Sequence, residues 1–496
     1  EQRASNFTTD LTQNYNLAAG LNPSPLYNYR ADNTLASVLG RVNYSYKGKY
    51  LATYSFRRDG TSKFRPGNKW ANFHSAALAW TATEEPFIKN LNLFSNLKFR
   101  ASLGTTGNQG VGPYGTLYQM YVSNAPIDAN GTIGAGYIVN DGLGLVDPEL
   151  GWETTRQADA GVDVSFLNNR LSFTIDAYHK RTTDLLQSVS IAPSTGFSTM
   201  LTNLATVQNR GLEFSVIGNI IQKSALKWNV NGNISFNRNK LLDLPGDQYA
   251  QRLYHGVDQV LIQRNGYPIG AIYGLTEDGF YDNLAEVRAD QRWSGLTDAQ
   301  LIQKVGTIKY KNMDNDPAVI SQATDRTIIG DTNPDYSFGL TNTINYKRFD
   351  FSVFVHGVIG GDIINTNLLK VRLSQTGNST KAAFDGRWTP ETAATATWPR
   401  ADASSTMEYL FSDRYIEDGS FVRLKTINLG YTFKSPAKFI GTLNVYANAN
   451  NLATITKYSW YDPDVNSFGA DASRRGVDMN SYPNTRTFTL GIKATL

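Results

Sequence analysis

The chain has 496 residues, of which 41% are hydrophobic, 12% aromatic and 18% charged. The low charge and the many Tyr and Phe residues favour strands over helices, the net charge of +4 argues against a nucleic-acid-binding surface, and the lack of cysteine excludes disulfides, Cys-ligated zinc and cysteine nucleophiles. No apolar run approaches the roughly 18 residues of a transmembrane helix, so a closed antiparallel β-barrel is the means by which this chain would cross a bilayer.

Alternation of apolar and polar residues predicts about fourteen strands. In chain order they lie near 1–10, 36–46, 49–58, 72–82, 96–106, 155–167, 171–186, 209–220, 226–237, 335–346, 348–359, 420–433, 440–451 and 484–496. The last is the clearest, because Phe488, Leu490 and Ile492 alternate with Thr489 and Gly491. Segments of about 10–13 residues exceed the usual globular strand and suit a tilted strand that crosses a membrane.

The connections between these strands alternate between short and long. Short turns are expected at 47–48, 168–170, 221–225, 347–348 and 434–439, and long loops at 11–35, 59–70, 106–154, 187–208, 238–334, 360–419 and 452–483. Outer-membrane barrels have short periplasmic turns and long extracellular loops. The connection 83–95 is the exception, since it is long for a periplasmic turn. The predicted fold class is therefore all-β, a transmembrane barrel with about fourteen strands in this chain.

Several stretches resemble one known family. They include GRVNYSYKGKYLATYSFRRDGTSKFRPGNKWANFHSAALAWTATEEPF (40–87), WETTRQADAGVDVSFLNNRLSFTIDAYHKRTTDLL (152–186) and YPNTRTFTLGIKATL (482–496). In this order they are similar to the SusC-like (RagA-like) TonB-dependent outer-membrane transporters. The resemblance implies a 22-stranded barrel with an N-terminal plug and a TonB box. It covers the C-terminal half only, so residues 1–496 are expected to form the C-terminal portion of the barrel, without the plug and the N-terminal strands. The last residue, Leu496, departs from the Phe that is common at that place in the family.

Residues with catalytic potential are few. The four histidines, His74, His179, His255 and His356, are scattered, and no H-E-x-x-H or G-x-S-x-G motif is present. The sequence therefore predicts a protein that is not an enzyme and that holds no cofactor.

One acidic segment, KNMDNDPAVISQATD (311–325), suggests a metal site. It places Asp314, Asn315, Asp316 and Asp325 in an arrangement that resembles a calcium loop. Pro317 stands where an EF-hand loop needs glycine for its sharp turn. Calcium binding is one interpretation of this segment, and a solvated acidic loop is the other.

The resemblance also implies a function. The chain is expected to belong to an importer of oligosaccharides or oligopeptides in the outer membrane of a Gram-negative bacterium. TonB would act through the N-terminal region, and a SusD-like lipoprotein would cover the long loops, with 238–334 as its docking surface. Loop aromatics that could stack on a glycan or peptide are Tyr281, Trp293, Trp388 and Trp460. Two alternatives stay open, a passive porin-like channel closed by the fourteen strands and a surface receptor or adhesin without transport.

Overall fold

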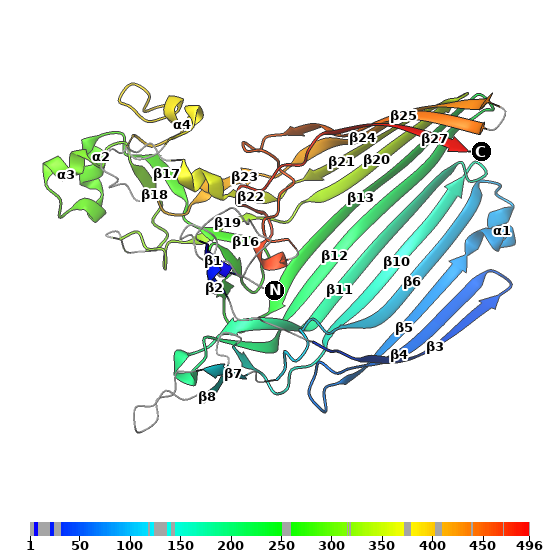
Figure 1. Ribbon diagram of the computed structural model, residues 1–496, viewed down its shortest axis with the longest axis horizontal. Helices are drawn as coiled ribbons and strands as arrows, with labels where there is room; N and C mark the ends of the chain where they lie inside the picture. Colours follow the sequence, from blue (N-terminus) through cyan, green and yellow to red (C-terminus); the bar gives the residue numbers. More distant parts are fainter. Residues whose placement is uncertain are drawn as a thin grey trace.

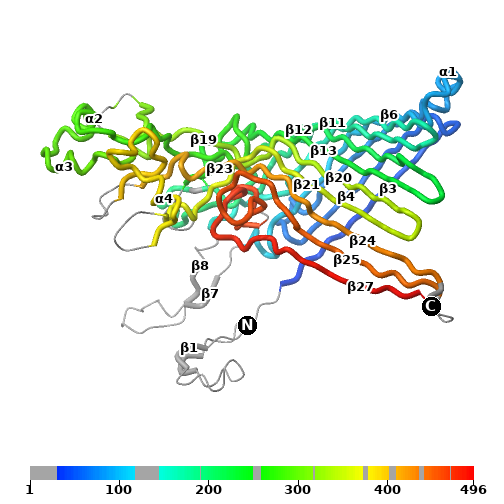
Figure 2. The backbone as a smooth tube through the Cα atoms, turned by 90° about the horizontal axis from the view of Figure 1, so that it is seen from above, coloured from blue at the N-terminus to red at the C-terminus, as the bar shows by residue number. Residues whose placement is uncertain are grey.

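One large curved antiparallel sheet dominates the computed structural model of the chain (Figures 1 and 2). The structure describes residues 4–7, 20–23, 31–117, 120–123, 136–139, 144–249, 259–314, 316, 319–371, 378–401, 409–437, 440–469 and 471–495. The sheet has 14 strands, because thirteen follow one another in an unbroken path and the short β9 (Leu145–Val146) pairs with β12. Thirteen of the fourteen strands expected from the sequence correspond to the path, whereas β9 lies within the loop expected at 106–154.

The thirteen strands of the path pair in the order in which they occur in the chain. They are β3 (Leu35–Tyr46), β4 (Tyr50–Thr61), β5 (Trp70–Thr81), β6 (Phe94–Asn108), β10 (Glu153–Phe166), β11 (Leu171–Ser190), β12 (Thr199–Gln222), β13 (Leu226–Asp243), β20 (Tyr336–Tyr346), β21 (Phe349–Ile359), β24 (Phe421–Ala437), β25 (Ile440–Thr456) and β27 (Thr487–Thr495). Each strand runs antiparallel to the next, as in an up-and-down barrel wall. In the described sheet the path ends at β3 and β27, which do not pair with each other.

The predicted strands and the observed ones differ in three respects. The strand expected at 1–10 is not part of the wall, because its described segment β1 (Ala4–Phe7) pairs with β2 (Gly20–Pro23) in a separate sheet. At the short-turn end β24 runs four residues past its predicted end, so most of the turn expected at 434–439 belongs to a strand that ends at Ala437. At their loop ends β11, β12, β13 and β25 run four to ten residues further than predicted, since their ladders continue past Thr182, Val207, Leu241 and Asn450. These extensions raise part of the wall above the other strands.

The two faces of the wall have opposite character. One cross-strand row places Phe99, Val162, Ile175 and Phe214 next to one another. The row beside it, on the other face, places Arg100, Gly161, Asp176 and Glu213 next to one another. Large apolar side chains on the first face are exposed, for example Leu490 at 85%. Because side chains alternate between the faces of a sheet, the first face forms an apolar outer surface and the second a polar inner one.

The two ends of the wall also differ, as the loop lengths predict. Short turns lie at the end that holds the C-terminus (Figure 1). Between β3 and β4, residues 47–49 form the turn, and Lys47 and Gly48 have φ values of 53° and 69°, the left-handed conformation of a type I′ turn. The longer connection 83–95 holds a short helix, α1 (Pro86–Lys89). Glu85, just before α1, accepts hydrogen bonds from Lys49 Nζ at 2.8 Å and Tyr50 OH at 2.6 Å.

The long loops at the other end contain small elements of their own. The strands are β7 (Met120–Ser123), β8 (Gly136–Val139), β14 (Gln248–Tyr249), β15 (Leu261–Gln263), β16 (Ala271–Gly274), β17 (Glu277–Phe280), β18 (Ile308–Tyr310), β19 (Thr327–Asp331), β22 (Asp362–Asn365), β23 (Ile416–Asp418) and β26 (Val477–Asp478). The helices are α2 (Leu284–Ala289), α3 (Asp298–Ile302) and α4 (Lys381–Asp385), together with the short 3₁₀ turns 193–195, 291–293, 366–370, 413–415 and 472–474. A further 3₁₀ turn, 82–84, lies at the opposite end, just before α1. Among the described residues, no helix is long and apolar enough to span a membrane.

Candidate functional site at the loop end of the wall

Three long loops are joined into one unit. Strand β22 of loop 360–419 pairs antiparallel with β23 of the same loop and parallel with β26 of the last loop. A buried core then links both loops to loop 238–334, and its members are Val260, Leu261, Ile272, Ile364, Leu369, Phe411, Tyr415 and Val477. Because a packed core resists shear between its parts, this three-loop unit holds its surface side chains at fixed relative positions.

Close approach of two loops requires glycine at position 476. Gly476 has a φ of +73°, and a Cβ atom there would lie 2.7 Å from Cβ and Cγ2 of Thr332. Glycine tolerates this left-handed conformation and leaves room for the neighbouring chain. The loop before β20 and the last loop therefore come together at Thr332.

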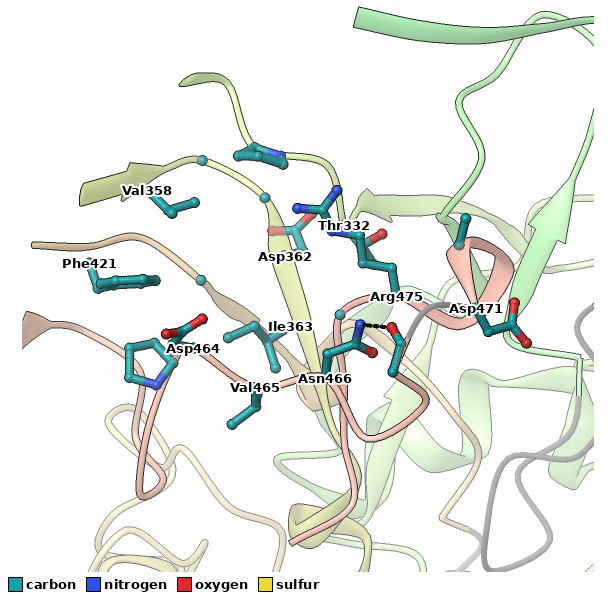
Figure 3. A pocket seen from close by; sticks show the side chains of 18 residues that line it. Thr332, Val358, Asp362, Ile363, Phe421, Asp464, Val465, Asn466, Asp471 and Arg475 are labelled. Carbon is teal, nitrogen blue, oxygen red and sulfur yellow. Dashed lines mark hydrogen bonds between the residues drawn. The ribbon is translucent and has the colours of Figure 1, made fainter. Parts of the chain in front are cut away.

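A cavity of about 480 Å³ lies between the three-loop unit and the end of the wall (Figure 3). Val358 and Phe421 form its floor from β21 and β24, where they face each other across the ladder. Both side chains lie on the inner face, because Val358 is two residues from His356 on β21 and Phe421 is two residues from Arg423 on β24. The cavity thus opens on the inner side of the wall, at the loop end.

The cavity contains charged side chains from two loops, namely Asp362 from loop 360–419 and Asp464, Asp471 and Arg475 from the last loop. Asp464 is 3.4 Å from the Arg423 guanidinium, and Asp471 is 2.6 Å from that of Arg474. Among the described residues, neither Asp362 nor Arg475 has an ion-pair partner within 4.0 Å. One carboxyl and one guanidinium are therefore left to interact with a polar solute.

Asp362 lies in an unfavourable place for a negative charge. Burial raises the pKa of its carboxyl, and the nearby carboxylates of Asp331, Asp418 and Asp335 raise it further. A hydrogen bond of 2.8 Å from the Asp331 backbone N–H to Asp362 Oδ2 lowers the pKa but does not cancel these effects. A cationic or hydrogen-bond-donating group that enters the cavity would stabilise the charged form of this carboxyl.

Arg423 ties the last loop to the wall below the cavity. Its side chain is 1% exposed and pairs with the buried carboxylate of Asp462, while Nε donates to Thr454 Oγ1 at 3.0 Å. Asp462 also accepts from the backbone N–H groups of Asp464 and Asn484, each at 2.9 Å. Burial raises the pKa of Asp462, but these backbone donors and Arg423 hold it below its usual range. The network fixes both ends of the last loop.

A second charged group lies on the inner face of the wall, nearer the short turns. Arg100 of β6 contacts three carboxylates, with 2.6 Å to Asp176, 3.3 Å to Asp163 and 3.6 Å to Asp159. Thr174 Oγ1 donates to Asp163 at 3.0 Å. Three carboxylates therefore share the guanidinium of Arg100 on this part of the inner face.

The predicted calcium segment is arranged around one buried carboxylate. Asp325 is fully buried, and its two oxygens accept from the backbone N–H groups of Met313 at 2.7 Å and Ser321 at 2.8 Å. Burial raises the pKa of Asp325, yet these N–H donors hold it below its usual range. Asp314 instead accepts from the N–H of Asp316 at 2.8 Å.

This arrangement does not gather the three described carboxylates, Asp314, Asp316 and Asp325, around one point. No set of three or more His, Cys, Asp or Glu side chains in the described residues is placed to hold a metal. Asn315 lies outside those residues. Calcium binding stays a prediction, and in the structure both oxygens of Asp325 already accept backbone hydrogen bonds.

None of the four loop aromatics is among the residues that line the cavity. Tyr281 is 1% exposed, and Trp388 is 8% exposed with Nε1 donating to Asp282 Oδ1 at 3.1 Å. Trp293 is half-buried beside Tyr281, with Lys304 Nζ at 4.3 Å from its ring. Trp460 is also half-buried and packs edge-on against Tyr461 at 5.4 Å. Stacking on a solute stays a prediction for all four, and for Tyr281 and Trp388 it would require the loop core to open.

Asp362, Arg423 and Arg475 were not singled out from the sequence. A partial signal exists for Arg423, because a charged residue stands between Val422 and Leu424 close to the end of a membrane strand. Asp362 and Arg475 are more than 110 residues apart, so their proximity depends on the pairing of β22 with β26. A two-residue strand gives no alternation that could reveal such a pairing.

Comparison with known proteins gives one consistent family. The family model described as TonB dependent receptor-like, beta-barrel, matches residues 2–452. The TonB-dependent receptor P3 of Formosa agariphila is 35% identical over 99% of this chain and 48% of that protein. The TonB-dependent receptor SusC of Bacteroides thetaiotaomicron is 32% identical over 94% of this chain and 44% of that protein. The chain thus spans about half the length of the curated relatives it matches.

Solved structures agree with the fold. A chain of the RagAB peptide transporter superposes with a TM-score of 0.78 at 24% identity, over 96% of this chain and 50% of that one. The closed-closed state of the RagAB peptide importer gives a TM-score of 0.77 at 24% identity, over 99% of this chain and 50% of that one. At this identity the likeness concerns the architecture of the wall.

Proposed function

Because this chain belongs to the TonB-dependent receptor-like β-barrel family, whose members are outer-membrane receptors and transporters rather than enzymes, we propose that it forms the C-terminal wall and outer loops of an active importer. The importer lies in the outer membrane of a Gram-negative bacterium and takes up oligosaccharides or oligopeptides. The observation that carries the proposal is the position of the cavity. It opens on the polar inner side, at the end where the long loops meet.

The two edges of the sheet support a barrel larger than the described wall. Strand β3 pairs only with β4, and β27 pairs only with β25, within the part of the chain that the structure describes. Open strand edges are not tolerated in lipid. The proposal therefore assigns further strands to polypeptide beyond residues 1–496, together with a plug and a segment on which TonB acts.

The three-loop unit supports the partner that the proposal includes. A SusD-like surface lipoprotein would close over these loops, with 238–334 as the main contact. This loop holds α2 and α3 on a core of its own, formed by Tyr281, Val287 and Leu301. A preformed surface binds a partner with less ordering cost than a flexible loop. Solute would then be enclosed between the lipoprotein and the cavity.

Two other functions make different use of the same wall. A passive channel needs a barrel that closes, and the unpaired edges of β3 and β27 argue against closure by the described strands. A receptor or adhesin needs only the loops, so it gives no role to the charged inner face around Arg100. We therefore favour the importer.

Uptake by whole cells tests the proposal. Cells that produce the full-length protein should take up labelled oligosaccharides or oligopeptides, and uptake should stop when TonB is deleted or the proton gradient is collapsed. The double variant Asp362→Asn/Arg475→Gln should lower uptake without lowering the amount of protein in the outer membrane. Uptake that continues without TonB would indicate a passive channel, and binding of solute without uptake would indicate a receptor.

A further inference from the structure

Basic side chains gather on the outer face of the wall, next to the loops. They lie on four consecutive strands, β10 to β13, and comprise Arg156, Arg181, Arg210, Arg238 and Lys240. Each of these residues is separated by an even number of positions from the apolar outer-face residues of its own strand, so it lies on the same face. For example, Arg156 precedes Ala158, Ala160 and Val162 at intervals of two residues. These five residues, the basic belt, therefore point away from the inner face.

The strand register places like charges directly opposite each other. Arg156 pairs with Arg181 across β10 and β11, and Arg210 pairs with Arg238 across β12 and β13. Like charges at directly opposed positions destabilise a sheet. An arrangement of this kind is favourable when an anion lies between the side chains.

The protein itself places few acidic side chains near these basic residues. Over 154–166, 171–181, 208–218 and 228–240, the outer face of the four strands carries no Asp or Glu. Arg156, Arg181 and Arg210 are exposed, and none of them has an ion pair within the described residues. Arg238 alone is paired, at 2.6 Å from Asp335, and that pair is itself exposed. Three guanidinium groups thus face outward without a counter-charge.

The basic belt lies at a defined depth. On β10 the apolar outer row runs from Ala158 to Phe166, next to the short turn. Nine residues at about 3.3 Å each, tilted by about 40°, span roughly 23 Å along the membrane normal, close to the apolar band of outer-membrane barrels. The basic belt follows directly beyond this band at the loop end. It therefore lies where lipid headgroups of the outer leaflet begin.

We propose that Arg156, Arg181 and Arg210 bind the phosphate groups of a lipid headgroup in the outer leaflet. Guanidinium groups match phosphate oxygens with paired hydrogen bonds. Four strands spaced by about 4.8 Å make a surface roughly 14 Å wide, enough for a headgroup with more than one phosphate. The inference rests on the proposed outer-membrane location but not on transport, because the basic belt lies on the face away from the cavity.

Lipid binding by the purified full-length protein in detergent tests the inference. The probes are lipid A with both phosphates and the same lipid A after removal of its phosphates, with affinity measured by native mass spectrometry. The protein should bind the phosphorylated form at least about tenfold more tightly, given the usual contribution of basic residues at anionic lipid surfaces. The triple variant Arg156→Gln/Arg181→Gln/Arg210→Gln should lose that preference.

A matched control removes the same number of charges at the other end of the wall. Lys47, Lys223 and Lys347 are exposed at the short turns, and Lys47→Gln/Lys223→Gln/Lys347→Gln should bind both lipids as the unaltered protein does. Equal affinity for the two lipids would overturn the inference, and so would an equal loss in the control. Solute uptake is measured separately, so failure of lipid binding is distinguishable from failure of the importer proposal.

Discussion

Arg423 of β24 and Asp462 of the last loop form an ion pair in which the side chains are only 1% and 7% exposed. Loss of one partner leaves a buried charge without compensation, which typically costs about 3–5 kcal/mol. We therefore expect Arg423→Met to detach the last loop from the wall. Hydrogen exchange of the amides in 457–486 should become faster, while that of β20 and β21 should not change.

The double variant Arg423→Met/Asp462→Leu is the control for this pair. Replacing both charges by apolar side chains removes the uncompensated carboxylate, so part of the protection should return. If the double variant exchanges faster than Arg423→Met, the pair is not the contact that holds the loop.

Gly476 and Gly469 give a matched comparison in the same loop. Both have a positive φ, but an added Cβ would meet Thr332 at 2.7 Å in the first case and nothing within 4 Å in the second. Gly469→Ala should cost only the conformational strain, about 1 kcal/mol. Gly476→Ala should cost more and should open the contact between the last loop and β19–β20. Limited proteolysis after Arg474 and Arg475 by trypsin would report the difference, and equal cleavage of both variants would refute it.

The raised pKa of Asp362 predicts a pH dependence of the loop unit. Since the folded state disfavours the charged carboxyl, stability from this group is fully present below the unfolded pKa of about 3.9 and is lost as the pH rises through the higher folded pKa. Asp362→Asn should therefore slow hydrogen exchange in β22 at neutral pH. At acidic pH the variant and the unaltered protein should exchange at the same rate. A difference in exchange rate that stays constant with pH would contradict this explanation.

Arg100 counters three carboxylates on the inner face. Arg100→Gln should leave Asp159, Asp163 and Asp176 to repel one another, at a cost of about 1–3 kcal/mol because the group is partly exposed. The melting temperature in detergent should fall in the variant at low salt, and it should fall less at high salt because salt screens the repulsion. Arg41→Gln is the comparison, as Arg41 donates to Ser55 Oγ at 2.9 Å and forms no ion pair with the residues that the structure describes.

Calcium binding by loop 311–326 and a purely structural role for Asp325 predict different effects of a chelator. If Asp325 acts by accepting the N–H groups of Met313 and Ser321, Asp325→Ala should destabilise loop 311–326 by about 1–3 kcal/mol and a chelator should have no effect. If the loop binds calcium, the chelator should reproduce the effect of Asp325→Ala. Protease sensitivity of the loop with and without the chelator distinguishes the two.

The wall was predictable from sequence because alternation persists over nine or more residues in each strand of the path. Strands β20, β21 and β27 begin within about three residues of their expected positions. Only one face needed to be apolar in each case, so period two was visible throughout. The loop lengths also predicted that the long loops gather at one end of the wall and the short turns at the other.

The site was not predictable in the same way. Its geometry depends on β22, β23 and β26, which have two to four residues each and pair between segments far apart in the chain. Tyr281 and Trp388 illustrate the same limit, because loop aromatics were expected to face a solute and both are buried in cores within the loops. Composition identifies an aromatic loop, but tertiary packing decides which rings are accessible.

The pairing of β26 with β22 also constrains how the protein matures. Val477 and Asp478 follow their partners Ile364 and Asn365 by more than 110 residues. Loops that leave the translocation machinery early must wait for this late segment before they can lock. A chain stalled during insertion would thus display unlocked outer loops, and cell-surface proteases would distinguish it from the finished molecule.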